Sequence, residues 1–274
     1  MGRVAVLTAL AMLAFAGNSL LCRAALRETP IDAATFTSIR MVSGALVLWL
    51  IVRMRGAGAR EGSWHSAFWL FAYAAAFSFA YVTLTAGTGA LLLFGAVQAT
   101  MIIAGFVRGE RFTPLQWLGF AVALGGLAAL LLPGVSAPPF VGAALMIAAG
   151  IAWGFYSLRG RGAGDPTRVT AGNFLRAVPM ALIVSVAMVS QFSVDAAGVA
   201  YAVASGAITS GVGYAIWYTA LPSLKATVAA TVQLSVPVIA AAGGVVLLGE
   251  ALTLRLVLCS IAILGGIALV VRRR

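Results

Sequence analysis

The stretch Gly109-Glu110-Arg111-Phe112-Thr113 occurs a second time in this chain as Gly249-Glu250-Ala251-Leu252-Thr253. In each copy a Gly-Gly pair inside a long apolar segment follows 16 residues after the first glycine, as Gly125-Gly126 and as Gly265-Gly266. Matching motifs at equal spacing indicate that the chain contains an internal duplication.

The earlier parts of the two halves also correspond. Equal spacing relates Ser19-x-x-x-Arg23 to Ser157-x-x-x-Arg161, and the pair Pro30 and Arg40 to the pair Pro166 and Arg176. We therefore expect two domains, residues 1–133 and 137–274. They meet at the proline-rich segment 133–139, through which a helix cannot continue.

Composition identifies the solvent around the chain. Apolar residues make up 62% of the 274 residues and charged residues only 9%. A soluble domain of this length would need more polar side chains on its surface, so the solvent must be lipid. A membrane-spanning helix needs about 20 apolar residues. Hydropathy predicts an all-α integral membrane protein with ten spans, five in each half. The expected spans are 4–22, 33–52, 66–85, 88–106, 114–132, 138–158, 171–190, 196–218, 224–247 and 253–271.

The basic residues predict the orientation of these spans. With the N-terminus in the cytoplasm, thirteen arginines and lysines fall in inner loops or tails and three, Arg23, Arg27 and Arg255, in outer loops. This bias predicts that both termini are cytoplasmic. Because each half has an odd number of spans, the two repeats are inverted relative to each other. Inverted repeats are typical of carriers that work by alternating access.

The charge and residue counts also exclude function classes. The net charge of +11 is spread over short loops without a basic domain, which favours contact with anionic lipid over nucleic-acid binding. One histidine, seven acids and no Walker A sequence give no basis for an enzyme, an ATP-driven pump, a metal site or a cofactor. Cys22 and Cys259 are interpreted as small apolar residues rather than as a disulfide.

The first spans of the two halves carry Phe15-Ala16-Gly17-Asn18-Ser19 and Trp153-Gly154-Phe155-Tyr156-Ser157. Together with the two Gly-Glu-x-x-Thr motifs, these segments resemble the drug/metabolite transporter superfamily and, within it, the EamA-type ten-helix exporters. The resemblance covers nearly the whole chain, although Phe15-Ala16 replaces the Trp-Gly of the family pattern. By overall similarity rather than by a diagnostic motif, the chain looks most like the YddG-like exporters of aromatic and other neutral amino acids.

The resemblance implies a carrier of the bacterial inner membrane that exports neutral amino acids, aromatic and otherwise bulky and apolar, and related metabolites by alternating access. It also implies a cavity between the halves, lined by spans one, three, four, six, eight and nine. Export of drugs, nucleotide sugars or phosphorylated metabolites on the same fold is an alternative. A channel or a structural membrane subunit is an alternative of a different class. A monomer contains both repeats and suffices mechanically, and the sequence leaves an oligomer open.

Polar and aromatic residues within the spans are the candidates for substrate binding. Buried amides and hydroxyls either tie helices together or line a cavity, where they would bind the ammonium and carboxylate groups of an amino acid. A large aromatic residue either packs helices or shapes a pocket for an apolar side chain. The candidates are Asn18, Ser78, Tyr81, Phe94, Gln98, Trp153, Tyr156, Tyr214 and Gln233.

Charged residues bear on coupling and gating. All seven acids fall near span ends or in loops, so we expect a facilitator without a mid-membrane carboxylate as proton relay. His65 is either an interfacial residue or a proton-coupling group. Arg40 and Arg176 lie inside their spans, where each either reaches the rim, pairs with a helix end or clamps a substrate carboxylate. Glu110 and Glu250 are interpreted as polar helix ends that bond backbone groups or arginines, with gates or substrate ligands as the alternative.

Overall fold

The computed structural model describes residues 2–56, 61–109, 111, 113–134, 136–160, 164–224, 229 and 232–271. The described residues form helices joined by short connections, and no strand occurs among them. The predicted all-α membrane fold is confirmed.

The helices of the first half are α1 (Gly2–Glu28), α2 (Ala33–Met54), α3 (Trp64–Tyr81), α4 (Ala86–Val107) and α5 (Pro114–Leu131). Those of the second half are α6 (Phe140–Arg159), α7 (Pro166–Ala187), η1 (Val189–Gln191), α8 (Ala196–Val203), η2 (Ala204–Val212), α9 (Gly213–Ala220), η3 (Leu221–Ser223), α11 (Ser235–Leu248) and α12 (Leu254–Val271).

Eight of the described helical units are long and apolar enough to cross a membrane, among them the continuous unit Ala196–Ser223. The chain is a multi-pass membrane protein. α3 has the length, but its tryptophan, tyrosine and histidine residues lower its hydropathy, and α11 has only 14 residues. Each of the ten expected spans overlaps one of these elements, and the count of ten crossings stays a prediction.

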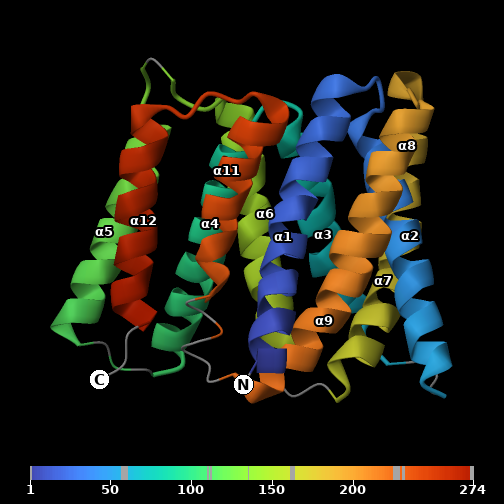
Figure 1. Ribbon diagram of the computed structural model, residues 1–274, viewed down its shortest axis with the longest axis horizontal. Helices are drawn as coiled ribbons and strands as arrows, with labels where there is room; N and C mark the ends of the chain where they lie inside the picture. Colours follow the sequence, from blue (N-terminus) through green and yellow to red (C-terminus); the bar gives the residue numbers. More distant parts are fainter. Residues whose placement is uncertain are drawn as a thin grey trace.

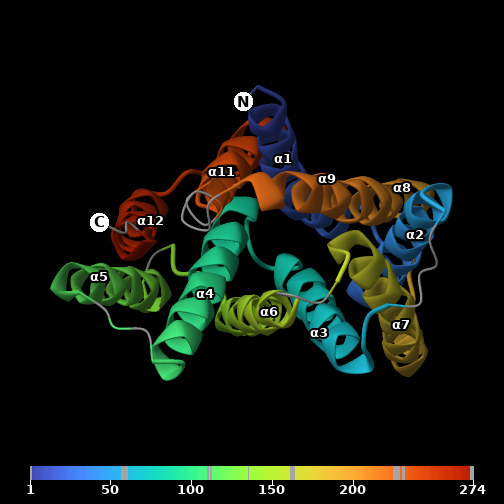
Figure 2. The same ribbon diagram turned by 90° about the horizontal axis from the view of Figure 1, so that it is seen from below.

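The helices stand side by side and alternate in direction along the chain (Figure 1). α1 begins and α12 ends at the same end of the bundle, which we call the terminal end; the opposite end is the distal end. In the view along the bundle, α5 and α12 form a pair at one edge (Figure 2). Towards the centre, α1 and α9 lie opposite α3 and α6.

The helix contacts of one half are matched by those of the other. α3 packs on α6 and α7, and the η2–α9 part of the eighth expected span packs on α1 and α2. α4 packs on α6 as α11 packs on α1, and α2 pairs with α7 as α5 pairs with α12. Exchange of the two halves leaves this pattern unchanged, as expected for repeats related by a two-fold axis.

The six described acids all lie at helix ends. Asp32, Asp165 and Asp195 are the N-caps of α2, α7 and α8, and each accepts hydrogen bonds from backbone N–H groups of its helix. Burial by itself would raise the pKa of Asp32, but hydrogen bonds from Thr35, Ser193 and Ala34 lower it below its ordinary value. Glu28, Glu61 and Glu250 lie at or next to the ends of α1, α3 and α11.

The repeated glycine of the Gly-Glu motif ends a helix in both halves. Gly249 is the C-cap of α11 with a φ of 60°, and Gly109 follows α4 with a φ of 89°. Both values lie in the left-handed region, which glycine adopts without a steric penalty. Glu110 lies outside the described residues, so its role stays a prediction.

The π-helix η2 packs tightly on α2 at Gly206. A Cβ atom at this position would collide with the hydroxyl of Ser43 and the carbonyl oxygen of Arg40. Small residues permit such close approach of two helix backbones inside a membrane. At this close approach the hydroxyl of Ser210 in η2 lies within hydrogen-bond distance of Arg40 in α2.

We expect Gly206→Ala to destabilise the protein, because the added methyl group would force η2 away from α2. Overpacking of this kind costs about 1–3 kcal/mol. Gly265→Ala in α12 is the matched control, since a Cβ atom there meets no atom within 4 Å. Thermal unfolding in detergent should show a lower apparent melting temperature for Gly206→Ala alone. Equal melting temperatures would contradict tight packing of η2 on α2.

Candidate substrate cavity

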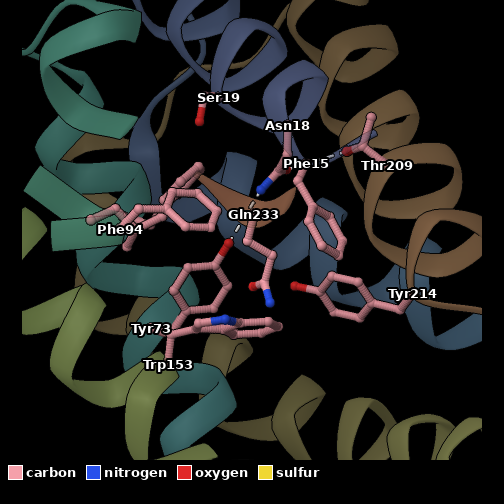
Figure 3. A pocket seen from close by; sticks show the side chains of 11 residues that line it. Phe15, Asn18, Ser19, Tyr73, Phe94, Trp153, Thr209, Tyr214 and Gln233 are labelled. Atoms are coloured by element: carbon pink, nitrogen blue, oxygen red, sulfur yellow. Dashed lines mark hydrogen bonds between the residues drawn. The ribbon is translucent and has the colours of Figure 1, made fainter. Parts of the chain in front are cut away.

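A small cavity lies inside the bundle, between helices of both halves (Figure 3). Its volume is about 20 Å³, which is room for the centres of one or two water molecules. Residues of α1, α3, α4, α6, the η2–α9 unit and the segment before α11 line it. The lining residues are Phe15, Asn18, Ser19, Tyr73, Phe77, Leu93, Phe94, Trp153, Thr209, Tyr214 and Gln233.

Aromatic rings form most of the cavity wall. The ring centroid of Trp153 lies 4.8 Å from that of Tyr73 and 5.3 Å from that of Tyr214. The ring of Phe15 meets Tyr214 edge-on at 5.8 Å. The amide of Gln233 extends between Tyr73 and Tyr214 (Figure 3). Such a wall offers a large apolar contact surface with hydroxyl and amide groups at defined places.

A chain of polar groups runs along one side of the cavity. The amide oxygen of Asn18 accepts hydrogen bonds from the hydroxyls of Ser205 at 2.7 Å and Thr209 at 3.3 Å. Its amide nitrogen donates to the hydroxyl of Tyr73 at 3.3 Å. Nη2 of Arg40 donates to the same hydroxyl at 3.2 Å. The chain thus connects α2, α3, α1 and η2.

Arg40 is completely buried, at 0% exposure. Besides the bond to Tyr73, its Nε donates to the hydroxyl of Ser210 at 3.4 Å. Its guanidinium carbon lies 4.9 Å from the ring centroid of Phe77 and 5.4 Å from that of Tyr73. The interpretation of Arg40 as a residue that reaches the rim or pairs with a helix end is therefore wrong: it points into the bundle.

Two larger cavities are lined mostly by apolar residues. One of about 840 Å³ lies between the first half of α1 and the segment 232–239, and another of about 680 Å³ lies near the distal end beside α3 and α6. Substrate sites combine an apolar wall with a few converging polar groups. The central cavity has this combination in spite of its smaller volume, so it is the candidate site.

Five of the nine predicted residues line the cavity: Asn18, Phe94, Trp153, Tyr214 and Gln233. The other four, Ser78, Tyr81, Gln98 and Tyr156, are buried outside its wall. The Ser78 hydroxyl donates to the carbonyl of Ala74, and the Tyr81 hydroxyl to that of Ala86. The Tyr156 hydroxyl accepts from the amide of Asn173 at 3.5 Å. The hydroxyls of Ser78 and Tyr81 therefore bond backbone carbonyls, and that of Tyr156 joins α6 to α7.

Six lining residues were not among the substrate-binding candidates that the sequence suggested: Phe15, Ser19, Tyr73, Phe77, Leu93 and Thr209. The helical spacing of the sequence could have identified some of these residues. Tyr73, Phe77 and Tyr81 are four residues apart and share one face of α3, so the choice of Tyr81 marked the correct face but a position nearer the distal end. Phe15 and Ser19 lie beside Asn18, one turn apart on α1.

An ion pair closes the distal end. Nε of Arg23 donates to Glu250 at 3.1 Å, and both side chains are largely buried. The second carboxylate oxygen of Glu250 accepts the backbone N–H of Ala86 at 2.8 Å, and Arg23 also donates to the carbonyl oxygens of Tyr81 and Val82. The pair thus ties the ends of α1 and α3, the start of α4 and the segment after α11.

Another set of bonds lies at the terminal end. Glu61 forms an ion pair with Arg168 at 3.0 Å, and its carbonyl oxygen accepts from Arg176 at 3.0 Å. Arg176 also donates to the carbonyl of Gly172. It therefore holds the segment before α3 against α7. Arg176 and Arg40 match in sequence but have different partners.

Comparison with known proteins agrees with this fold. Residues 140–272 match the EamA-like transporter family. An uncharacterized protein of Pseudomonas aeruginosa is 59% identical over 99% of this chain and 96% of its own. A crystal structure with a TM-score of 0.69 and 19% identity, covering 98% of this chain and 96% of that one, shares the overall fold. The second half of this membrane protein is a domain of the EamA-like transporter family, in the drug/metabolite transporter superfamily, whose members transport small molecules.

Proposed function

We propose that this protein exports neutral amino acids with bulky apolar or aromatic side chains across the bacterial inner membrane by alternating access. The observation that carries the proposal is the central cavity, which has aromatic walls and a polar side. Phe15, Trp153 and Tyr214 would contact the apolar side chain of the substrate. Asn18 and Gln233 would bind its charged groups, because an amide both donates and accepts hydrogen bonds.

The closed cavity fits one step of an alternating cycle. A volume of about 20 Å³ cannot hold an amino acid, so the helices around the cavity must separate to admit one. If the termini are cytoplasmic, as the basic loops predict, the Arg23–Glu250 pair closes the outer side. Matched contacts in the two halves support an exchange in which one side opens as the other closes.

The positions of the acids support a facilitator. The six described acids lie at helix ends, so none of them is placed for proton relay in mid-membrane. His65 is exposed near the start of α3 and stacks on Trp69, with ring centroids 6.4 Å apart. It does not line the cavity, which favours the interfacial interpretation.

Uptake into liposomes that hold the purified protein tests the proposal. We expect saturable uptake of phenylalanine, tryptophan and methionine, which does not require a proton gradient. The same panel includes a nucleotide sugar and a quaternary ammonium drug. Transport of only one of these two would leave the fold intact and overturn the amino-acid assignment. Strict dependence on a proton gradient would overturn the facilitator assignment and direct attention to His65.

Trp153→Ala should impair this transport, because Trp153 contacts both tyrosines of the cavity wall. Loss of an aromatic contact at a substrate should lower uptake at low substrate concentration about tenfold. Trp64→Ala is the matched control, since Trp64 is 60% exposed and lies at the start of α3. Initial uptake rates, normalised to the folded yield, give the comparison. Equal rates for both variants would remove Trp153 from the site.

Glu250→Gln should make the distal end open more often. The substitution keeps the side-chain size but removes the charge that Arg23 and the start of α4 bind. The readout is the reaction of a membrane-impermeant thiol reagent with a cysteine placed at Ser19, in a protein whose Cys22 and Cys259 are replaced by alanine.

We expect labelling from the distal side to accelerate about tenfold, since a hydrogen bond to a charged group contributes about 1.5–3 kcal/mol. Asp195→Asn is the control, because Asp195 caps α8 at the same end. Unchanged labelling in Glu250→Gln would leave the ion pair as a static tie between helix ends.

A further inference from the structure

The positive charge of Arg40 has no counter-ion among the described residues. The two ion pairs there join Arg23 to Glu250 and Arg168 to Glu61. Among the described residues, the groups that hydrogen-bond to Arg40 or make cation–π contacts with it are all neutral: the hydroxyls of Ser210 and Tyr73 and the rings of Tyr73 and Phe77. Its Nη1 atom is buried and has no hydrogen-bond partner within the part of the chain that the structure describes.

A cation in this position is costly. An arginine inside a membrane protein normally pairs with an acid or reaches a water-filled region, because lipid and protein interior solvate charge poorly. The rings of Phe77 and Tyr73 compensate part of this cost through cation–π contacts. They leave the net charge and the Nη1 donor unsatisfied, so an anion near Arg40 would be bound favourably.

The cavity is the place where such an anion can arrive. Tyr73 and Phe77 separate Arg40 from the cavity and belong to its wall. The Tyr73 hydroxyl accepts from both Arg40 and Asn18. A phenol oxygen that accepts two hydrogen bonds still carries its own proton, which it can donate to a third group. The arginine behind Tyr73 makes that proton a stronger donor, because hydrogen bonds in a chain polarise one another.

We propose that Arg40, acting through Tyr73, makes this side of the cavity a carboxylate site. A substrate with a carboxylate would be accepted whether or not it carries an ammonium group, and the corresponding amine without a carboxylate would be rejected. The proposal rests on the proposed function only in using the same cavity. Arg40 is a positioning residue here, since Tyr73 rather than Arg40 lines the cavity.

Three probes with one phenethyl group test the site: phenylalanine, phenylpropanoate and phenethylamine. Their binding to the purified protein in detergent is measured by titration calorimetry. We expect phenylalanine and phenylpropanoate to bind and phenethylamine to bind at least about tenfold more weakly, as expected when one hydrogen bond to a charged group is lost. Equal affinity for phenethylamine and phenylpropanoate would overturn the proposal.

Two variants assign the effect. Arg40→Gln removes the charge and keeps a polar but shorter side chain, and Tyr73→Phe removes the hydroxyl alone. Each should weaken phenylpropanoate binding about tenfold and leave phenethylamine binding within about twofold. If Arg40→Gln does not fold, Tyr73→Phe still tests the proposal. Arg176→Gln is the matched control, because Arg176 occupies the corresponding sequence position but bonds to backbone carbonyls. An equal loss for both probes in Tyr73→Phe would indicate a structural role and overturn the carboxylate site.

The result separates this proposal from the proposed function. Arg40-dependent binding of phenylpropanoate without transport of any amino acid would retain the carboxylate site and overturn the export assignment. Amino-acid transport that is unaffected by Arg40→Gln and equally inhibited by phenethylamine and phenylpropanoate would retain the export assignment and overturn the carboxylate site.

Discussion

Inside a membrane, every polar group must find its partner within the protein, because lipid offers none. In this protein that constraint produces the polar chain from Arg40 through Tyr73 and Asn18 to Ser205. The chain connects helices of both halves, and the cavity lies against it. The close approach at Gly206 brings η2 to α2, and the π-helix presents Ser205 to Asn18 and Ser210 to Arg40. Helix packing and the polar side of the cavity therefore depend on the same contacts.

The described carboxylates lie at the ends of the helices rather than in the middle of the bundle. The described acids cap helices or join helix ends, where water and backbone N–H groups stabilise a carboxylate. At the distal end Glu250 and Arg23 connect several helix ends through one ion pair and backbone bonds. The two ion pairs of the described residues thus lie at opposite ends of the bundle, with the polar chain between them, so the ion pair that opening of one side must break lies at that side.

Hydropathy predicted where the spans lie, because lipid selects long apolar segments and the loops between them hold glycine, proline and arginine. It did not predict which face of a span points inward. Many spans are apolar around their whole circumference, so Tyr81 and Gln98 looked as suitable for a cavity as Asn18 and Gln233. The π-helix was also not predictable, since Ala204–Val212 consists of small residues that fit an ordinary helix. Only the three-dimensional contacts place Tyr73 between Arg40 and the cavity.

The comparison of the two halves bears on the meaning of Arg40. A crystal structure shares the fold at 19% identity, so the fold tolerates wide changes of sequence. Arg176 holds the matching sequence position in the middle of α7, yet its side chain bonds the backbone carbonyls of Gly172 and of Glu61, in the segment before α3. A five-helix unit of this kind can therefore be built with its arginine away from the centre. The buried charge at Arg40 is better explained by what enters the cavity than by what the helices need to fold.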